Sequence, residues 1–249
     1  MLEQGVDIIL HGRSEQKLEA ASQQLANQFG AERIHALQAD LSDASETEAL
    51  AKAVIETNDS LDILINNAGI LNSPAPLTKY GIDVRLLVNT ISPYILCRRL
   101  LPIIPSSGRI INLASAAQAP VELNALRTDV GLDTMQAYSQ SKLALIMWSE
   151  QLANELRDGP TVIAVNPGSL LASKMVKEGF GVEGKDMNIG ADILVELSVD
   201  DQHAAHSGDY FDNDAGDYGP PHPSAKDPEL AQKIVQTMEQ TWADISSSD

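Results

Sequence analysis

The alternation of short β-branched runs with longer amphipathic stretches is the feature that most constrains the fold of this chain. A short apolar run bounded by turn residues is typical of a buried strand, and a longer run with helical spacing is typical of a helix. The predicted strands are 6–10, 34–38, 61–66, 109–114 and 161–166, with one more short strand inside 207–223. The predicted helices are 14–29, 43–56, 80–101, 135–157 and 228–242. This order predicts an α/β protein with a doubly wound parallel sheet.

The length and composition of the chain fit one domain with a large core. It has 249 residues, 43% of them hydrophobic, and we find no internal repeat and no interdomain linker. We therefore predict a single domain over 1–245 and a frayed tail at 246–249. Residues 169–190 contain four glycines and no clear period, which indicates a mobile flap.

Charge and residue types exclude several classes of function. The net charge of -18 would repel a phosphate backbone, so we predict no nucleic-acid partner. The single cysteine, Cys97, excludes an intramolecular disulfide and a cysteine zinc site, and its apolar helical neighbours predict a core position. No histidine pair or carboxylate cluster has metal-ligand spacing, so we predict no metal. No apolar run is long enough for a membrane span, and the first residues lack a secretory signal, which predicts a cytoplasmic protein.

Tyr138 and Lys142 are the candidate proton-transfer pair. They lie four residues apart in the predicted helix 135–157, and this spacing places them on one face. A phenol with a pKa of about 10 is a poor base at neutral pH, and a neighbouring ammonium lowers that pKa toward the working range. The alternative interpretation is a half-buried aromatic residue beside a solvated lysine.

Small and polar residues follow three successive predicted strands at the point where each strand ends. These residues are Asn67-Ala68-Gly69, Ser115 and Pro167-Gly168. Ligands of open parallel sheets bind outside the carboxyl ends of the strands. The sequence therefore predicts a ligand site at this edge of the sheet.

Several of these residues stand in an order that is typical of one enzyme family. They are Asn66-Asn67-Ala68-Gly69, Asn89, Ser115, Tyr138-x-x-x-Lys142 and Pro167-Gly168. In this order and context the chain resembles the short-chain dehydrogenases/reductases over nearly its whole length, from about residue 2 to residue 242. The resemblance implies a Rossmann-like fold. It also implies an NAD(P)-dependent oxidoreductase that interconverts an alcohol and a carbonyl by hydride transfer.

The resemblance implies a role for each catalytic candidate. Tyr138 would be the general acid/base, and Ser115 would hydrogen-bond the substrate oxygen. Lys142 would hold the nicotinamide ribose and lower the pKa of Tyr138. Asn89 would support a water-linked proton path to Lys142.

The resemblance also implies which residues contact the cofactor. They are Arg13, Asp40, Leu41, Asn67, Ala68, Gly69, Tyr138, Lys142, Pro167 and Gly168. Asp40 matches the residue that meets the adenine ring, although a loop or helix-entry residue is the alternative. Arginine at position 13 suits a ribose 2′-phosphate, whereas an acidic residue there would pair with a 2′-hydroxyl. NADP is therefore favoured over NAD, and the alternative is an exposed arginine beside a helix start.

Two features resemble the retinol-dehydrogenase-like branch of the family. Ser115 and Tyr138 are 23 positions apart, and residues 210–213 read Tyr-Phe-Asp-Asn. We expect the 210–213 segment to pack near the active site, with a surface or subunit contact as the alternative. Apolar residues in the predicted flap suggest an apolar alcohol or carbonyl substrate, although core packing explains them almost as well: Leu170, Leu171, Met175, Val176 and Phe180. The resemblance also suggests a homodimer or homotetramer, for which the two long helices offer an interface.

The family's first strand and glycine-rich phosphate loop have no counterpart in this sequence. We therefore expect a chain truncated at its N-terminus, with an unpaired or rearranged sheet edge beside strands 6–10 and 61–66 and with weak or absent cofactor binding. The alternative function is a non-catalytic remnant that acts as a binding or oligomer-forming subunit. The coding DNA upstream of Met1 distinguishes the two, because an in-frame strand and glycine-rich loop there would favour the enzyme.

Overall fold

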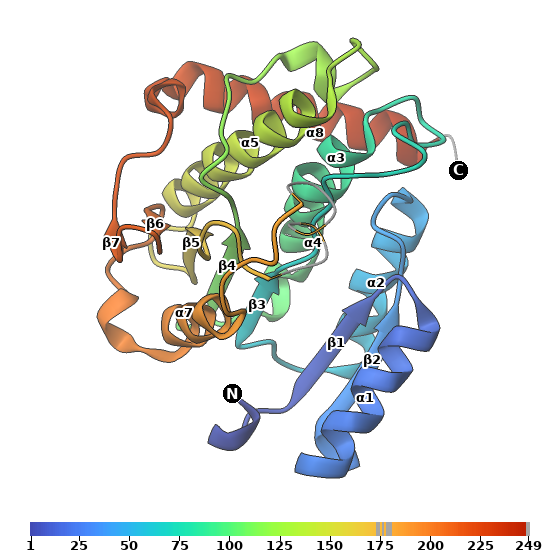
Figure 1. Cartoon of the computed structure of the whole chain (residues 1–249), viewed down its shortest axis with the longest axis vertical. Coiled ribbons are helices and arrows are strands. Elements are labelled where there is room, and N and C mark those ends of the chain that lie inside the picture. The colour runs from blue at the N-terminus through green and yellow to red at the C-terminus, as the bar shows by residue number, and fades with distance from the viewer. Residues whose placement is uncertain (173–174, 176, 178–180, 248–249) are drawn as a thin grey trace.

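The computed structural model describes residues 1–172, 175, 177 and 181–247, and these form two β-sheets flanked by helices (Figure 1). The smaller sheet is parallel and pairs β1 (Ile8–Gly12) with β2 (Ile34–Gln38). The larger sheet has the order β3-β4-β5-β6-β7. Its strands are β3 (Ile63–Asn66), β4 (Arg109–Leu113), β5 (Thr161–Asn166), β6 (Tyr210–Asp212) and β7 (Asp217–Tyr218). Only β7 is antiparallel to its neighbour.

The helices that flank these sheets come largely from the predicted amphipathic stretches. They are α1 (Glu15–Phe29), α2 (Ala44–Thr57), α3 (Val84–Leu86), α4 (Ser92–Leu100), α5 (Thr134–Glu155), α7 (Asn188–Val199) and α8 (Pro228–Ser246). A π-helical turn, Leu87–Ile91, joins α3 to α4. α8 packs on α5 and on α2 (Figure 1). It therefore covers part of the α5 surface that we considered for subunit contact.

The central strands β4 and β5 of the larger sheet are buried on both faces, as a doubly wound fold requires. Successive side chains of a strand point to opposite faces. Accordingly, Ile110 and Val162 belong to the core shared with α4 and α5, whereas Ile111 and Ile163 pack with Ile193 of α7. The predicted α/β fold with a parallel sheet is therefore confirmed.

β1 and β3 are edge strands, because over the described residues no backbone pairing joins the two sheets. Every residue of β1 is half-buried, whereas β4 and β5 are buried throughout. The unpaired sheet edge expected beside strands 6–10 and 61–66 therefore lies at these two strands.

Two predicted elements differ from the structure in their bounds. The helix predicted from residue 80 begins at Val84, because Gly81 takes the left-handed φ of 72° and Asp83 caps the helix by accepting a hydrogen bond from the Arg85 amide. The strand predicted at 6–10 lies two residues later, at Ile8–Gly12.

Some structure near the C-terminus was not predicted from the sequence. α7 occupies Asn188–Val199, at the end of the predicted flap, and β7 was not predicted as a strand. The rest of the flap prediction falls partly on 173–174, 176 and 178–180, which lie outside the described residues, as do 248–249 of the predicted tail. Within the part of the chain that the structure describes, no helix is long and apolar enough to cross a membrane.

Candidate active site

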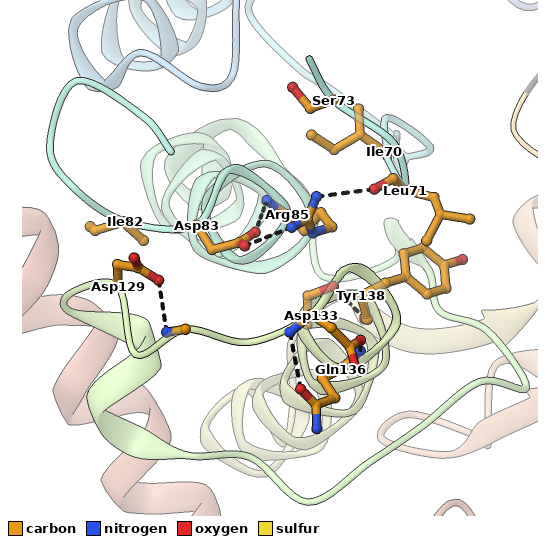
Figure 2. A network of polar contacts seen from close by, with 12 residues as sticks. Ile70, Leu71, Ser73, Ile82, Asp83, Arg85, Asp129, Asp133, Gln136 and Tyr138 are labelled. Atoms are coloured by element: carbon orange, nitrogen blue, oxygen red, sulfur yellow. Dashed lines mark hydrogen bonds and ion pairs between the residues drawn. The ribbon is translucent and has the colours of Figure 1, made fainter. Parts of the chain in front are cut away.

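Tyr138 and Lys142 lie on α5, and the first turn of this helix sets their register. Asp133 and Gln136 form a capping box there (Figure 2). The backbone N–H of Gln136 donates to Asp133 Oδ1 at 2.8 Å, and the backbone N–H of Asp133 donates to Gln136 Oε1 at 3.0 Å. The Lys142 Nζ lies 5.8 Å from the centroid of the Tyr138 ring. The two residues therefore share one helix face, as their spacing predicted.

The Lys142 ammonium is buried at the carboxyl end of β4. The residue is 4% exposed, and its Nζ donates a hydrogen bond to the Leu113 carbonyl at 2.7 Å. Burial disfavours the charged form and lowers the pKa of Lys142 to about 8. The solvated lysine that we kept as an alternative is therefore excluded.

The Tyr138 hydroxyl lies in an environment different from the one we expected. Burial raises the pKa of Tyr138 above its ordinary value of 10.0, and a hydrogen bond with the Ser115 side chain lowers it in part. We expected Lys142 to lower this pKa. In the structure the lysine is itself desolvated, and its Nζ is directed to the Leu113 carbonyl.

Asn89 connects α5 to the turn that follows β3. It is fully buried in the π-helical turn, a local widening of the helix that is often found at functional sites. Its Oδ1 accepts from the Ile70 amide at 2.8 Å, and its Nδ2 donates to the Ile70 carbonyl at 3.0 Å and to Ser141 Oγ at 3.0 Å. A Cβ added at Gly69 would lie 3.4 Å from Lys142 Nζ and 3.6 Å from Asn89 Oδ1. Gly69 therefore lies directly beside both groups.

The residues assigned to the adenine end of the cofactor lie together at a second place. Arg13 and Asp40 line a surface cavity of about 410 Å³ that extends to Ile70. The Arg13 side chain is 70% exposed and lies 3.9 Å from the Asp40 carboxylate. Leu41 is buried, and its carbonyl accepts from Ser92 Oγ at 2.7 Å. Tyr138 and Lys142 are not among the residues that line this cavity.

The remaining assigned residues lie in turns after β3 and β5. Asn67 is exposed, and Ala68 is half-buried against the core. Gly168 has a φ of 125°, in the left-handed region that favours glycine, and with Pro167 it directly follows β5. The structure thus brings Asn89, Ser115, Tyr138, Lys142 and Gly69 together and places Arg13 and Asp40 at a separate cavity.

Two residues hold the segment after β5: Asn213, which belongs to the predicted 210–213 run but was given no contact there, and Asp214, which was missed. The Asn213 side chain donates to the Pro167 carbonyl at 2.9 Å, and Asp214 accepts from the Ser169 amide at 3.0 Å. Burial raises the pKa of Asp214, but hydrogen bonds from Ser169 and Asn166 outweigh this effect and hold the pKa below its usual value. The Tyr-Phe-Asp-Asn run pointed to this region, but nothing in the sequence marked Asp214.

A buried ion pair that holds the chain after Gly69 was also missed. Arg85 is 3% exposed; it donates to Asp83 Oδ2 at 2.8 Å and to the Leu71 carbonyl at 3.2 Å (Figure 2). Two opposite charges inside an otherwise apolar stretch are a signal that could have identified it, because a charge is rarely buried without a partner. Among the described residues, no three of His, Cys, Asp and Glu gather as a metal ion would require.

Comparison with known proteins decides the family. Residues 1–181 match the family model of the short chain dehydrogenases. The chain belongs to this family. Human retinol dehydrogenase 13 is 30% identical over 250 residues, which covers 92% of this chain and 75% of that protein. Human dehydrogenase/reductase SDR family member 13 is 34% identical over 171 residues, which covers 66% of this chain and 45% of that protein. The family and its retinol-dehydrogenase-like branch are thus confirmed.

Solved structures of other proteins agree with this fold. An uncharacterized protein from Mycobacterium paratuberculosis superposes with a TM-score of 0.73 at 24% identity, over 94% of this chain and 83% of that chain. A short chain dehydrogenase from Shigella flexneri complexed with NADP gives 0.65 at 23% identity, over 83% of this chain and 85% of that chain. Both likenesses support the Rossmann-like fold of this family member.

Proposed function

We propose that this short chain dehydrogenase is an NADP-dependent oxidoreductase that interconverts an alcohol and a carbonyl, with Tyr138 as the general acid/base. The observation that carries the proposal is the contact of the Tyr138 side chain with Ser115, one helical turn from the buried Lys142. Proton transfer to a carbonyl oxygen requires a positioned proton donor. Here that donor lies with a second hydroxyl and a buried cation in one place.

The chemistry of carbonyl reduction divides between the cofactor and these side chains. NADPH, when bound, supplies the hydride that the carbonyl carbon accepts. The Tyr138 hydroxyl donates its proton to the carbonyl oxygen, and the Ser115 hydroxyl donates a hydrogen bond to the same oxygen. The pKa of Tyr138 is raised by burial above an ordinary value that already keeps a phenol protonated at neutral pH, so the residue holds the proton that it donates to the carbonyl oxygen.

Separate groups of residues would hold the two ends of the cofactor. Lys142 would bind the nicotinamide ribose beside Gly69, and Pro167 with Gly168 would border the nicotinamide. We assign no described residue to the pyrophosphate.

Asp40 would meet the adenine, and Arg13 would pair with a 2′-phosphate. The Arg13 guanidinium is exposed and lines the cavity, which supports NADP over NAD, because a guanidinium in that position can donate two hydrogen bonds to phosphate oxygens.

Exposed apolar side chains in the segment after β5 support an apolar substrate. Leu170 is 43% exposed and Met187 is 51% exposed, and both belong to the segment between β5 and α7. Leu170 follows Pro167 and Gly168 closely in the chain, so the segment begins beside the proposed nicotinamide end. The alignment with a retinol dehydrogenase also supports an apolar alcohol or aldehyde.

The test is Tyr138→Phe in the chain as its gene encodes it, assayed with NADPH and a panel of apolar aldehydes and ketones. Turnover should fall by about 10²–10⁴-fold, because removal of a positioned acid/base costs that much, while NADPH affinity changes little. Tyr218→Phe, which removes a hydroxyl bonded to His203, is the matched control and should keep full turnover. Undiminished turnover in Tyr138→Phe would remove Tyr138 from the mechanism and with it the proposed function.

A further inference from the structure

The backbone carbonyl of Ser115 accepts two side-chain hydrogen bonds from parts of the chain far apart in sequence. The Gln118 Nε2 donates to it at 2.9 Å, and the Tyr210 hydroxyl donates to it at 3.3 Å. A carbonyl oxygen has two lone pairs, so these donors occupy its full accepting capacity. The peptide that follows Ser115 is therefore held from two sides.

The orientation of Gln118 is set by the C-terminal part of the chain. Its Oε1 accepts from the His222 amide at 2.7 Å, and this leaves the Nε2 to face the Ser115 carbonyl. Because an amide N–H can donate only to the oxygen end of Gln118, the contact with His222 excludes the flipped side chain. The segment from Tyr210 to His222 thus supplies one donor directly and orients the other.

Tyr210 is a rigid donor. It is 5% exposed, it pairs with Ala164 of β5 in the sheet register, and its carbonyl accepts from the Gly219 amide at 3.1 Å. Burial raises the pKa of Tyr210, so its hydroxyl keeps its proton across the pH range in which proteins are stable.

The held peptide matters because the Ser115 hydroxyl depends on it. Ser115 Oγ accepts from the Ala117 amide at 3.1 Å, a local turn whose geometry is determined by the peptides on either side. The same hydroxyl makes the hydrogen bond with Tyr138. A rotation of the peptide after Ser115 would change both contacts together.

We propose that Gln118 and Tyr210 are positioning residues that act through the Ser115 carbonyl to hold the Ser115 hydroxyl against Tyr138. This inference rests on the proposed function, in which Ser115 and Tyr138 share the substrate oxygen. It makes Tyr210, Gln118 and the His222 amide part of the network that aligns the proton donor, although neither side chain contacts the reacting atoms.

The first test reads the protonation of Tyr138 directly and needs no substrate. Tyrosine labelled at Cζ is incorporated, the Tyr138 signal is assigned by its loss in Tyr138→Phe, and the signal is titrated by NMR. Tyr210→Phe and Gln118→Met each raise the pKa of Tyr138, because a displaced Ser115 no longer stabilises the phenolate. The variant with both changes shows the largest shift. Tyr218→Phe removes a partly buried hydrogen bond from neighbouring β7 and leaves the Tyr138 pKa unchanged.

The second test is kinetic. Tyr210→Phe and Gln118→Met lower kcat by about threefold to tenfold, the range expected when one hydrogen bond is lost, while KM for NADPH stays within about twofold. Equal pKa values for Tyr138 in all variants, or an equal shift in Tyr218→Phe, would overturn the inference. If instead Tyr138→Phe keeps full turnover, the proposed function fails, and the NMR titration still decides whether these residues position Ser115.

Discussion

The buried ammonium of Lys142 makes a prediction about stability that can be tested without any substrate. Lys142 is 4% exposed, and burial lowers its pKa from 10.5 to about 8. The unfolded chain therefore binds a proton at this residue between pH 8 and 10.5, where the folded chain does not. Folding stability rises with pH wherever the unfolded state holds more protons, so Lys142 destabilises the fold at pH 7 and ceases to do so as the pH approaches 10.5.

The size of the effect follows from the shift. The difference 10.5 − 8 is 2.5 pKa units, or about 3.4 kcal/mol of destabilisation below pH 8 at 1.36 kcal/mol per unit. Between pH 7 and pH 10 about 2.5 kcal/mol of this cost disappears. Lys142→Met keeps the apolar stem and removes the charge, and the loss of the donor to the Leu113 carbonyl costs about 1–3 kcal/mol. That second cost does not depend on pH, so the pH dependence isolates the buried charge.

The assay is urea unfolding of the wild type and Lys142→Met at several pH values from 7 to 10. The free energy of unfolding of the wild type, minus that of Lys142→Met, should increase by about 2.5 kcal/mol over this range. Lys52→Met is the matched control, because the Lys52 side chain is 72% exposed. The free energy of unfolding of the wild type, minus that of Lys52→Met, should not change with pH over this range. A flat difference for Lys142→Met as well would refute the reasoning that the ammonium is desolvated.

Three further predictions concern other parts of the molecule. Asp83→Ala leaves the buried Arg85 charge without its carboxylate partner and should reduce the free energy of unfolding, measured in urea, by about 3–5 kcal/mol. The control is Asp7→Ala, which removes the ion pair of Asp7 with Arg33. The Asp7 side chain is 72% exposed, so this change should cost less than about 1 kcal/mol. Arg13→Glu should weaken NADPH binding by about tenfold or more and leave NADH binding little changed, measured by fluorescence titration; equal losses would contradict a 2′-phosphate contact. Cys97 is fully buried, and burial raises its pKa to about 12, so a thiol reagent should modify it only as fast as the protein unfolds; fast labelling of the native protein would contradict this.

The sequence by itself determined those features that depend on residues close together in the chain. Strands and helices followed from local periodicity, and the shared face of Tyr138 and Lys142 followed from their spacing on α5. The set of turns at the carboxyl ends of β3, β4 and β5 also followed, because parallel strands end at one edge of a sheet.

Only the tertiary structure decided the electrostatics and the support of the site. The direction of the Tyr138 pKa was expected to be downward, yet burial by elements distant in sequence raises it. Gln118 and Tyr210 meet at one carbonyl although Tyr210 is 95 residues from Ser115, and no local pattern encodes such a contact. Desolvation and hydrogen-bond geometry are properties of atoms brought together by folding, whereas periodicity is a property of neighbours along the chain. For this reason the sequence identified Tyr138 and Lys142 as the candidate proton-transfer pair, and the fold determined the burial and the hydrogen bonds of both side chains.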